Sequence, residues 1–151
     1  MFNSPLITVA IGVVRTGDTV LLTQRRKNAD CPNRWEFPGG KVHADETVHA
    51  GLNRELYEEI GIVVKRYSPL IQFGHQYSHG FVRGYVYLID DYTGSPQPVE
   101  GQAMQWVNRH DVHQFKMLDA NHIICQKIVG SIQGLFPFLK GSKIVTFTYT
   151  I

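Results

Sequence analysis

Three glutamates crowd a stretch of five residues, and their spacing suits the binding of a divalent metal ion. Residues three and four positions apart share one face of a helix, so Glu55, Glu58 and Glu59 would project together. Like charges at this spacing destabilise a helix by about 0.2–0.5 kcal/mol per pair, and Arg54 is the only cation nearby within the segment. Hard cations such as Mg²⁺ bind carboxylate oxygens, often together with substrate phosphates. The cluster therefore predicts a metal site; the alternative is an ordinary solvated helix face.

The segment that carries these glutamates has the pattern of an amphipathic helix. An apolar side chain recurs every fourth residue and would form one buried stripe. The stripe consists of Val48, Leu52, Leu56 and Ile60. Thr47 is suited to cap the start of the helix, and Gly61 is suited to end it. Residues 38–40, Pro-Gly-Gly, predict a loop before the helix whose backbone could come close to the metal site.

The remaining sequence predicts strands on either side of this helix and a second helix near the end. Apolar and β-branched runs indicate strands at residues 5–14, 19–25, 35–37, 62–77, 81–92 and 102–108. The turn at residues 16–18 predicts that the first two strands form a hairpin. We expect a second full helix over residues 119–132, capped by Asp119, after one helical turn at residues 109–115. Two helices can cover opposite faces of a sheet, so the expected class is α/β in layers.

The C-terminal residues predict one more strand. Apolar or aromatic residues alternate with threonines over residues 145–151, which is strand periodicity. Left unpaired, such a strand would expose backbone groups that template further pairing. We therefore expect residues 143–151 to pair with a sheet edge of this chain or of a second subunit. The chain is then either a monomer or a homodimer formed through this strand.

Length and composition exclude several classes of protein. The chain has 151 residues, 43% of them hydrophobic and 19% charged, which indicates one ordinary domain over residues 1–151 with a C-terminal extension at 141–151. A net charge of +2 gives no global field for a nucleic-acid polymer. The two cysteines match no metal spacing, and no apolar run reaches the roughly 18 residues that span a bilayer. The N-terminal residues lack the pattern of a signal peptide. We expect a cytoplasmic protein with no membrane partner.

The glutamate cluster and the residues around it resemble the Nudix box at every specified position. The matching positions are Gly40, Glu46, Arg54-Glu55-Leu56, Glu58-Glu59 and Gly61-Ile62. The segments LLTQRR, NRWEFPGGKV, VEGQAMQWV and LDAN are similar to the MutT branch of that superfamily, in the same order, so the resemblance covers roughly residues 5–130. It implies an α/β/α sandwich around a mixed β-sheet. It also implies Mg²⁺-dependent hydrolysis, with Mn²⁺ able to replace Mg²⁺, in which water attacks the β-phosphorus of a nucleoside triphosphate and releases a monophosphate and pyrophosphate.

The resemblance also implies which residues do this chemistry. The metal ligands would be the backbone carbonyl of Gly39 and the carboxylates of Glu55, Glu58, Glu59 and Glu100. The general base would be Glu55, with Glu100 the second choice. Arg54 would pair with Glu46 to hold the loop and helix together, and Lys41 would lie near the phosphates. The alternatives are a solvated loop carboxylate for Glu100 and an ordinary surface lysine for Lys41.

Three further positions match the nucleobase pocket of the MutT branch, namely Arg25, Phe37 and Asn121. An asparagine side chain both donates and accepts hydrogen bonds, so it can read the edge of a purine such as 8-oxoguanine. Phe37 would add an apolar surface near the base. The alternatives are a polar residue in the first helical turn for Asn121 and a core aromatic residue for Phe37.

The chain departs from the MutT pattern at three positions. Asp30 replaces a histidine, Gly80 stands near the place of a pocket arginine, and Gly51 replaces a small alanine within the helix. A glycine there costs about 1 kcal/mol relative to alanine, so close packing against the loop is the expected reason for Gly51. Our first hypothesis is hydrolysis of 8-oxo-dGTP, with hydrolysis of CTP, dCTP or a modified pyrimidine nucleotide as the alternative. A non-catalytic nucleotide-binding domain is a remote hypothesis, because all glutamates of the box are present.

Overall fold

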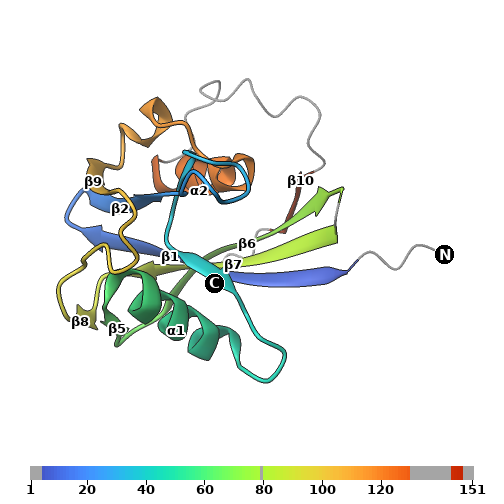
Figure 1. The fold of residues 1–151 in the computed structure, drawn as a ribbon, viewed down its shortest axis with the longest axis horizontal. Coiled ribbons are helices and arrows are strands. Elements are labelled where there is room, and N and C mark those ends of the chain that lie inside the picture. Colours follow the sequence, from blue (N-terminus) through green and yellow to red (C-terminus); the bar gives the residue numbers. More distant parts are fainter. Residues whose placement is uncertain (1–4, 79, 130–143, 148–151) are drawn as a thin grey trace.

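In a computed structural model, the chain forms one mixed β-sheet with a helix on each face (Figure 1). The structure describes residues 5–78, 80–129 and 144–147. Within them, the sheet contains β1 (Leu6–Thr16), β2 (Thr19–Gln24), β3 (Trp35–Glu36), β4 (Gly39–Lys41), β6 (Ser68–Tyr77), β7 (Gly80–Ile89), β9 (Met104–Asn108) and β10 (Ile144–Phe147). A separate pair is formed by β5 (Val63–Val64) and β8 (Tyr92–Thr93). The helices are α1 (Val48–Ile60) and α2 (His122–Val129), with 3₁₀ turns η1 (Val112–Gln114) and η2 (Asp119–Asn121).

Strand β1 lies at the centre of the sheet and pairs with three neighbours. The strand order is β10-β6-β7-β1-β2-β3, with β4 also on β1 and β9 also on β2. β1 runs parallel to β7, whereas its pairs with β2 and β4 are antiparallel. Its end forms the predicted hairpin with β2, through the pairs Arg15 with Val20 and Thr16 with Thr19. The loop predicted at residues 38–40 is only partly correct, because Gly39 to Lys41 form β4, a short strand paired with β1.

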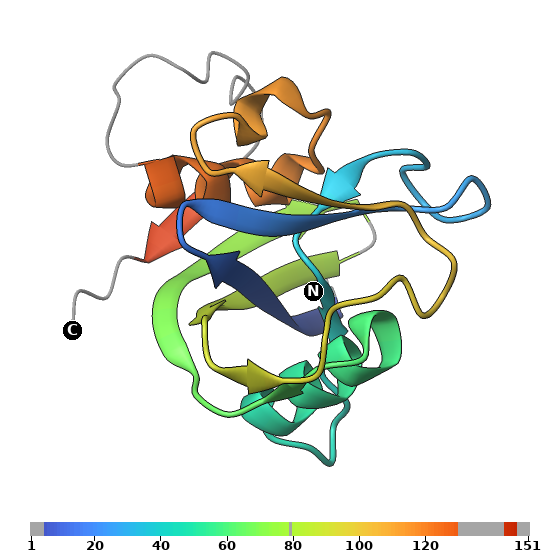
Figure 2. The same ribbon diagram turned by 90° about the vertical axis from the view of Figure 1, so that its left-hand side faces the viewer.

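The two faces of β1 contribute to two separate hydrophobic cores. Ile11 and Val13 belong to the core that contains Ile124 and Cys125 of α2, and Ala10 and Val14 belong to the core under α1. This alternation follows from the two-residue period of a strand. Leu52, Leu56 and Ile60 of α1 are fully buried, so the stripe read from the sequence packs on the sheet. Figures 1 and 2 show α1 and α2 on opposite sides, which confirms the expected α/β/α layers.

Helix α1 begins and ends at the predicted capping residues. The side chain of Thr47 accepts a hydrogen bond from the N–H of Ala50 (3.1 Å), and Gly61 has the left-handed conformation (φ 74°) that glycine tolerates best. Gly51 is buried, and a Cβ atom there would lie 3.0 Å from the Oε1 of Glu46 and 3.2 Å from the side chain of Val42. The missing side chain at Gly51 therefore makes room for the loop before the helix, as the sequence suggested.

Three predicted elements differ from the structure. The single strand expected over residues 81–92 is divided into β7, which ends at Ile89, and β8, which begins at Tyr92. The single strand expected over residues 62–77 is divided into β5 and β6, which pair with different partners. The cap predicted at Asp119 is wrong, because Asp119 opens the turn η2 after Leu118 and α2 begins only at His122. Residues 130–132 of that predicted helix lie outside the described residues.

The predicted C-terminal strand is present as β10 and pairs antiparallel with β6 of the same chain. Its register joins Ile144 to His75 and Phe147 to Gln72. The other residues of the predicted strand, 143 and 148–151, lie outside the described part. In the described segments, no helix has the length and apolar character required to cross a membrane.

Candidate active site

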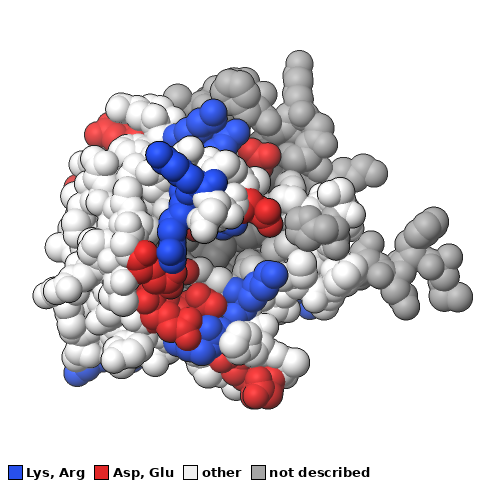
Figure 3. Space-filling view, viewed as in Figure 1, with Lys and Arg blue, Asp and Glu red and all other residues white. Residues whose placement is uncertain are grey.

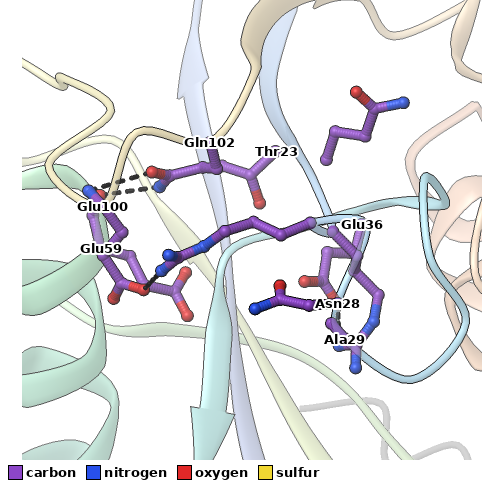
Figure 4. A pocket seen from close by; sticks show the side chains of 10 residues that line it. Thr23, Asn28, Ala29, Glu36, Glu59, Glu100 and Gln102 are labelled. Atoms are coloured by element: carbon purple, nitrogen blue, oxygen red, sulfur yellow. Dashed lines mark hydrogen bonds and ion pairs between the residues drawn. The ribbon is translucent and has the colours of Figure 1, made fainter.

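A cleft of about 440 Å³ opens where the loop after β2, strand β3, the end of α1 and the loop before β9 meet. Its lining is polar: Thr23, Gln24, Arg25, Arg26, Asn28, Ala29, Glu36, Glu59, Glu100 and Gln102. On the face seen in Figure 3, acidic side chains gather beside a hollow in the surface and basic side chains lie along its rim. A close view shows Glu59 and Glu100 lying together on one side, with Glu36 across the view from them (Figure 4). The cleft thus combines clustered carboxylates with guanidinium groups.

Arg54 binds the loop before α1 to the helix itself. Its guanidinium donates to both carboxylate oxygens of Glu46, with Nη2 to Oε1 at 2.7 Å and Nε to Oε2 at 3.1 Å. Arg54 also donates to the backbone carbonyl of Lys41 (2.9 Å). The hydrogen bonds from Arg54 and from the N–H of His43 lower the pKa of Glu46 to about 2. The predicted pairing of Arg54 with Glu46 is confirmed.

The same guanidinium also contacts two of the three clustered glutamates. Nη1 of Arg54 lies 3.0 Å from Oε1 of Glu55 and 3.3 Å from Oε2 of Glu58. Glu55 is largely enclosed, with 17% of its side chain exposed, whereas Glu58 is 52% exposed. The repulsion that the sequence indicated is therefore partly relieved by Arg54 without any metal ion.

Glu59 occupies a different environment from the other two helix glutamates. Its side chain lines the cleft, where Oε2 accepts a hydrogen bond from the N–H of Gly39 (3.3 Å). Burial, together with the negative charges of Glu36, Glu55 and Glu100, raises the pKa of Glu59 to about 9, against the lowering effect of the Gly39 bond. In the absence of a cation, Glu59 therefore keeps its proton at neutral pH.

Strand β4 brings glycine backbone against both the sheet and the glutamates. Gly39 has φ 151°, and a Cβ atom there would lie 2.1 Å from the carbonyl oxygen of Ala10, so only glycine fits. A Cβ atom at Gly40 would lie 2.5 Å from the carboxyl carbon of Glu55. The backbone of β4 therefore packs directly on the Glu55 carboxylate, which is the close approach that the two glycines suggested.

Glu100 is held from two directions at the mouth of the cleft. Its Oε2 accepts from Nη2 of Arg26 at 2.8 Å, and its backbone N–H donates to Oε1 of Gln102 at 3.1 Å. Nε2 of Gln102 in turn donates to the backbone carbonyl of Glu59 (2.9 Å). Gln102 thereby ties the Glu100 loop to the end of α1 (Figure 4).

Sequence reasoning missed most residues that line the cleft, among them the charged or bridging residues Arg26, Glu36 and Gln102. Glu36 is half-buried in β3, and burial raises its pKa, although Nη1 of Arg25 lies 3.4 Å from its Oε2. Glu36 stands close before the Pro38-Gly39-Gly40 segment, and this position was the sequence signal that could have identified it as a site residue. Nothing in the spacing of Arg26 or Gln102 indicates their contacts, because these depend on which loops meet.

The residues predicted for the nucleobase pocket are only partly brought together. Oδ1 of Asn121 accepts from the N–H of Phe37 at 3.0 Å, and both side chains are buried, 4% and 2% exposed. The ring of Phe37 belongs to the core that also contains Met117 and α2. Arg25 instead lines the cleft, where its Nε donates to the carbonyl of Asp30. Lys41 lies exposed at the end of β4.

The carboxylates of the site are suited to a metal ion by their chemistry, although most of them are held by arginines. Across the described residues, no group of three or more His, Cys, Asp and Glu side chains stands ready to hold a metal ion. Arg54 holds Glu55 and Glu58, and Arg26 holds Glu100. The donors are nevertheless oxygen atoms only, and their charges raise the pKa of Glu59. An oxygen donor set with surplus negative charge fits a hard divalent cation.

Comparison with known proteins agrees with this geometry. Residues 6–125 match the family described as the NUDIX domain. The chain is similar to the 8-oxo-dGTP diphosphatase of Haemophilus influenzae, with 39% identity over 124 residues, covering 80% of this chain and 91% of that protein. It is also similar to the CTP pyrophosphohydrolase of Escherichia coli, with 29% identity over 116 residues, covering 77% of this chain and 86% of that protein.

A solved structure resembles the fold over nearly the same part of the chain. The crystal structure of the MutT NUDIX hydrolase from Burkholderia pseudomallei superposes with a TM-score of 0.75 at 26% identity, covering 82% of this chain and 98% of that one. The mixed sheet with α1 and α2 on opposite faces is the part that they share. By its box, its fold and its relatives, the chain belongs to the Nudix family and is a pyrophosphohydrolase of the MutT type.

Proposed function

We propose that this protein hydrolyses 8-oxo-dGTP, or a related oxidised purine deoxynucleoside triphosphate, to the monophosphate and pyrophosphate. It would thereby remove damaged nucleotides from the cytoplasmic pool. The observation that carries the proposal is the cleft lined by Glu36, Glu100 and the half-buried Glu59, where these charges and that of Glu55 act on the Glu59 carboxyl. Such surplus negative charge suits a divalent cation and the triphosphate that accompanies it. The similarity to an 8-oxo-dGTP diphosphatase supports the choice of substrate.

The residues that would hold Mg²⁺, or Mn²⁺ in its place, come from α1, β4 and the loop before β9. They are the carbonyl of Gly39 and the carboxylates of Glu55, Glu58, Glu59 and Glu100. When bound, the metal would supply charge neutralisation at the phosphoryl oxygens. The raised pKa of Glu59 supports this proposal, because a cation beside its carboxylate would favour the charged form and so oppose that shift.

In the reaction, a water oxygen forms a bond to the β-phosphorus as the bond from that phosphorus to the departing nucleoside monophosphate breaks. We assign the water proton to Glu55, with Glu100 as the second candidate base. Glu55 is held in place by Nη1 of Arg54 at 3.0 Å and by the backbone of Gly40. Lys41 would add positive charge near the phosphates, and phosphoryl transfer depends mostly on such positioning and charge.

Asn121 and Phe37 are proposed to recognise the nucleobase. The amide of Asn121 is buried and bonded to the N–H of Phe37, so its orientation is defined, and an amide offers both a donor and an acceptor to a purine edge. Arg25 would contact the nucleotide from the cleft wall, where Glu36 and the carbonyl of Asp30 hold its guanidinium.

A second candidate substrate is CTP, dCTP or a modified pyrimidine triphosphate. It is favoured by Asp30, which stands where the MutT branch has a histidine and whose carbonyl binds Arg25. The similarity to a CTP pyrophosphohydrolase supports the same alternative.

The deciding experiment is a kcat/KM panel of 8-oxo-dGTP, dGTP, CTP, dCTP and 5-methyl-dCTP, measured as pyrophosphate release with Mg²⁺ and with EDTA. A ratio strongly in favour of 8-oxo-dGTP supports the first proposal, and a preference for a pyrimidine supports the second. Absence of metal-dependent hydrolysis of every nucleotide would leave a binding domain as the function.

Glu55→Gln tests the assignment of the base. Loss of a general base costs about 10²–10⁴-fold in rate, so kcat should fall at least about 100-fold while the circular dichroism spectrum is unchanged. Asp91→Asn is the matched control, because it removes one exposed carboxylate outside the cleft. A Glu55→Gln variant that keeps more than about a tenth of the activity contradicts the assignment.

A further inference from the structure

Arg26 forms an ion pair across the mouth of the cleft, between the loop after β2 and the loop before β9. Its Nη2 lies 2.8 Å from Oε2 of Glu100, and both side chains are partly exposed, at 52% and 41%. Both residues line the cleft together with the half-buried Glu59. The proposed metal ligand Glu100 therefore already carries a counter-ion, supplied by this chain.

The backbone at Glu100 is held independently of this ion pair. Gln102 accepts a hydrogen bond from the N–H of Glu100 and donates one to the carbonyl of Glu59. Arg26 contacts only the end of the Glu100 side chain. The carboxylate can therefore leave the guanidinium through side-chain rotation, while the loop stays attached to α1.

We propose that Arg26 is the counter-ion that Glu100 exchanges for the divalent cation, and that the released guanidinium then binds the triphosphate. The inference rests on the proposed function for its second half only. The cation and the guanidinium compete for the same carboxylate, and they repel each other when both are close. Arg26 is then left at the mouth of the cleft beside an incoming polyphosphate.

The chemistry of arginine suits this exchange. An exposed ion pair changes an equilibrium by no more than about five-fold, so it yields readily to a stronger ligand. A guanidinium binds phosphate oxygens through two parallel hydrogen bonds, which a lysine cannot reproduce. The Arg26 side chain can therefore form an ion pair with Glu100 before the nucleotide binds and hydrogen bonds to the phosphates afterwards.

The test uses the full chain with Arg26→Ala and, as the matched control, Lys27→Ala. Lys27 is the next residue of the same loop, is exposed and does not line the cleft. Binding of Mn²⁺ without nucleotide is measured by calorimetry and by electron paramagnetic resonance. Arg26→Ala should bind Mn²⁺ about two- to five-fold more tightly, because the competing ion pair is gone, whereas Lys27→Ala should bind it as the unaltered protein does.

The second readout is steady-state kinetics at saturating metal. Arg26→Ala should raise KM for the triphosphate at least about three-fold with kcat unchanged, since uniform binding to the phosphates is lost. Arg26→Lys should recover part of this loss, because it restores the charge without the paired hydrogen bonds. The two readouts thus change in opposite directions, which a merely structural role for Arg26 would not produce.

Three results would show which part of the reasoning fails: the exchange, the role at the phosphates or the proposed function. Mn²⁺ binding that is unchanged or weaker in Arg26→Ala overturns the exchange, as would equal effects in both variants. Tighter Mn²⁺ binding without a change in KM overturns the role of Arg26 at the phosphates. If the unaltered protein hydrolyses no nucleotide, the proposed function fails, and the Mn²⁺ titration still decides the exchange.

Discussion

The half-buried carboxyl of Glu59 should make the metal-free protein less stable as the pH rises. Its pKa is about 9 in the folded chain against 4.5 for an unperturbed glutamate. Between these values the folded state holds a proton that the unfolded state has released. The contribution of Glu59 to the free energy of unfolding is therefore fully present below about pH 4.5 and is lost as the pH rises towards about 9.

The size of the effect follows from the same linkage. Each pH unit within this window changes the free energy of unfolding by about 1.4 kcal/mol for one proton. From about pH 7 to about pH 8.5 the loss is roughly 2 kcal/mol, which corresponds to a Tm lower by roughly 4–8 °C. The window starts near pH 7 because burial lowers the pKa values of His75 and His122, so their contribution to the pH dependence lies below it.

The assay is a series of melting curves in EDTA for the unaltered protein, Glu59→Gln and Glu58→Gln. Glu59→Gln should flatten the dependence of Tm on pH, because the neutral amide has no proton to lose. Glu58→Gln is the matched control: it makes the same substitution in the same helix at an exposed site and should keep the decline. If Tm falls equally with pH in Glu59→Gln and in the unaltered protein, the burial argument for Glu59 is refuted.

Three further substitutions test other contacts of the site. Gly40→Ala should displace the Glu55 carboxylate, because the new Cβ would lie 2.5 Å from the carboxyl carbon; kcat should fall by at least about ten-fold with the fold retained, and an unchanged kcat would contradict the placement. Asn121→Ala should reduce the preference for 8-oxo-dGTP over dGTP by about 1–3 kcal/mol, measured as a ratio of kcat/KM; a constant ratio would shift the proposal to pyrimidines. Gln102→Ala removes the hydrogen bond from the loop to the Glu59 carbonyl of α1 and the bond within the loop from the N–H of Glu100. It should lower the free energy of unfolding, measured in urea, by about 1–3 kcal/mol, whereas no change in the midpoint would show that these bonds do not hold the loop.

The elements set by local pattern were predictable from the sequence. Helix α1, its caps at Thr47 and Gly61 and its buried stripe follow from a four-residue repeat and from conformational preferences that need no distant partner. The pairing of Arg54 with Glu46 was implied by the resemblance to the Nudix box and not by a local pattern. The apolar runs also located β1 and β2, whereas the strands expected over residues 62–77 and 81–92 are each divided into two.

Contacts between distant loops could not be predicted. Arg26 and Glu100 are 74 positions apart, and their meeting depends on β2 and β9 pairing at the edge of the sheet. Strand β4 was missed because glycine has low strand propensity, and only the neighbouring β1 makes residues 39–41 a strand. Asp119 was taken as a helix cap because a 3₁₀ turn carries the same local signal.

The two cysteines differ so much in environment that one of them can be labelled selectively in the unaltered chain. Cys125 is fully buried in the core under α2, and burial raises its pKa to about 12, so its reactive thiolate is scarce at neutral pH. Cys31 is exposed in the loop between β2 and β3, the loop that also carries Arg26. A maleimide fluorophore should therefore label Cys31 selectively in the folded protein. Its emission would follow the movement of that loop as metal and nucleotide bind, with no substitution in the chain.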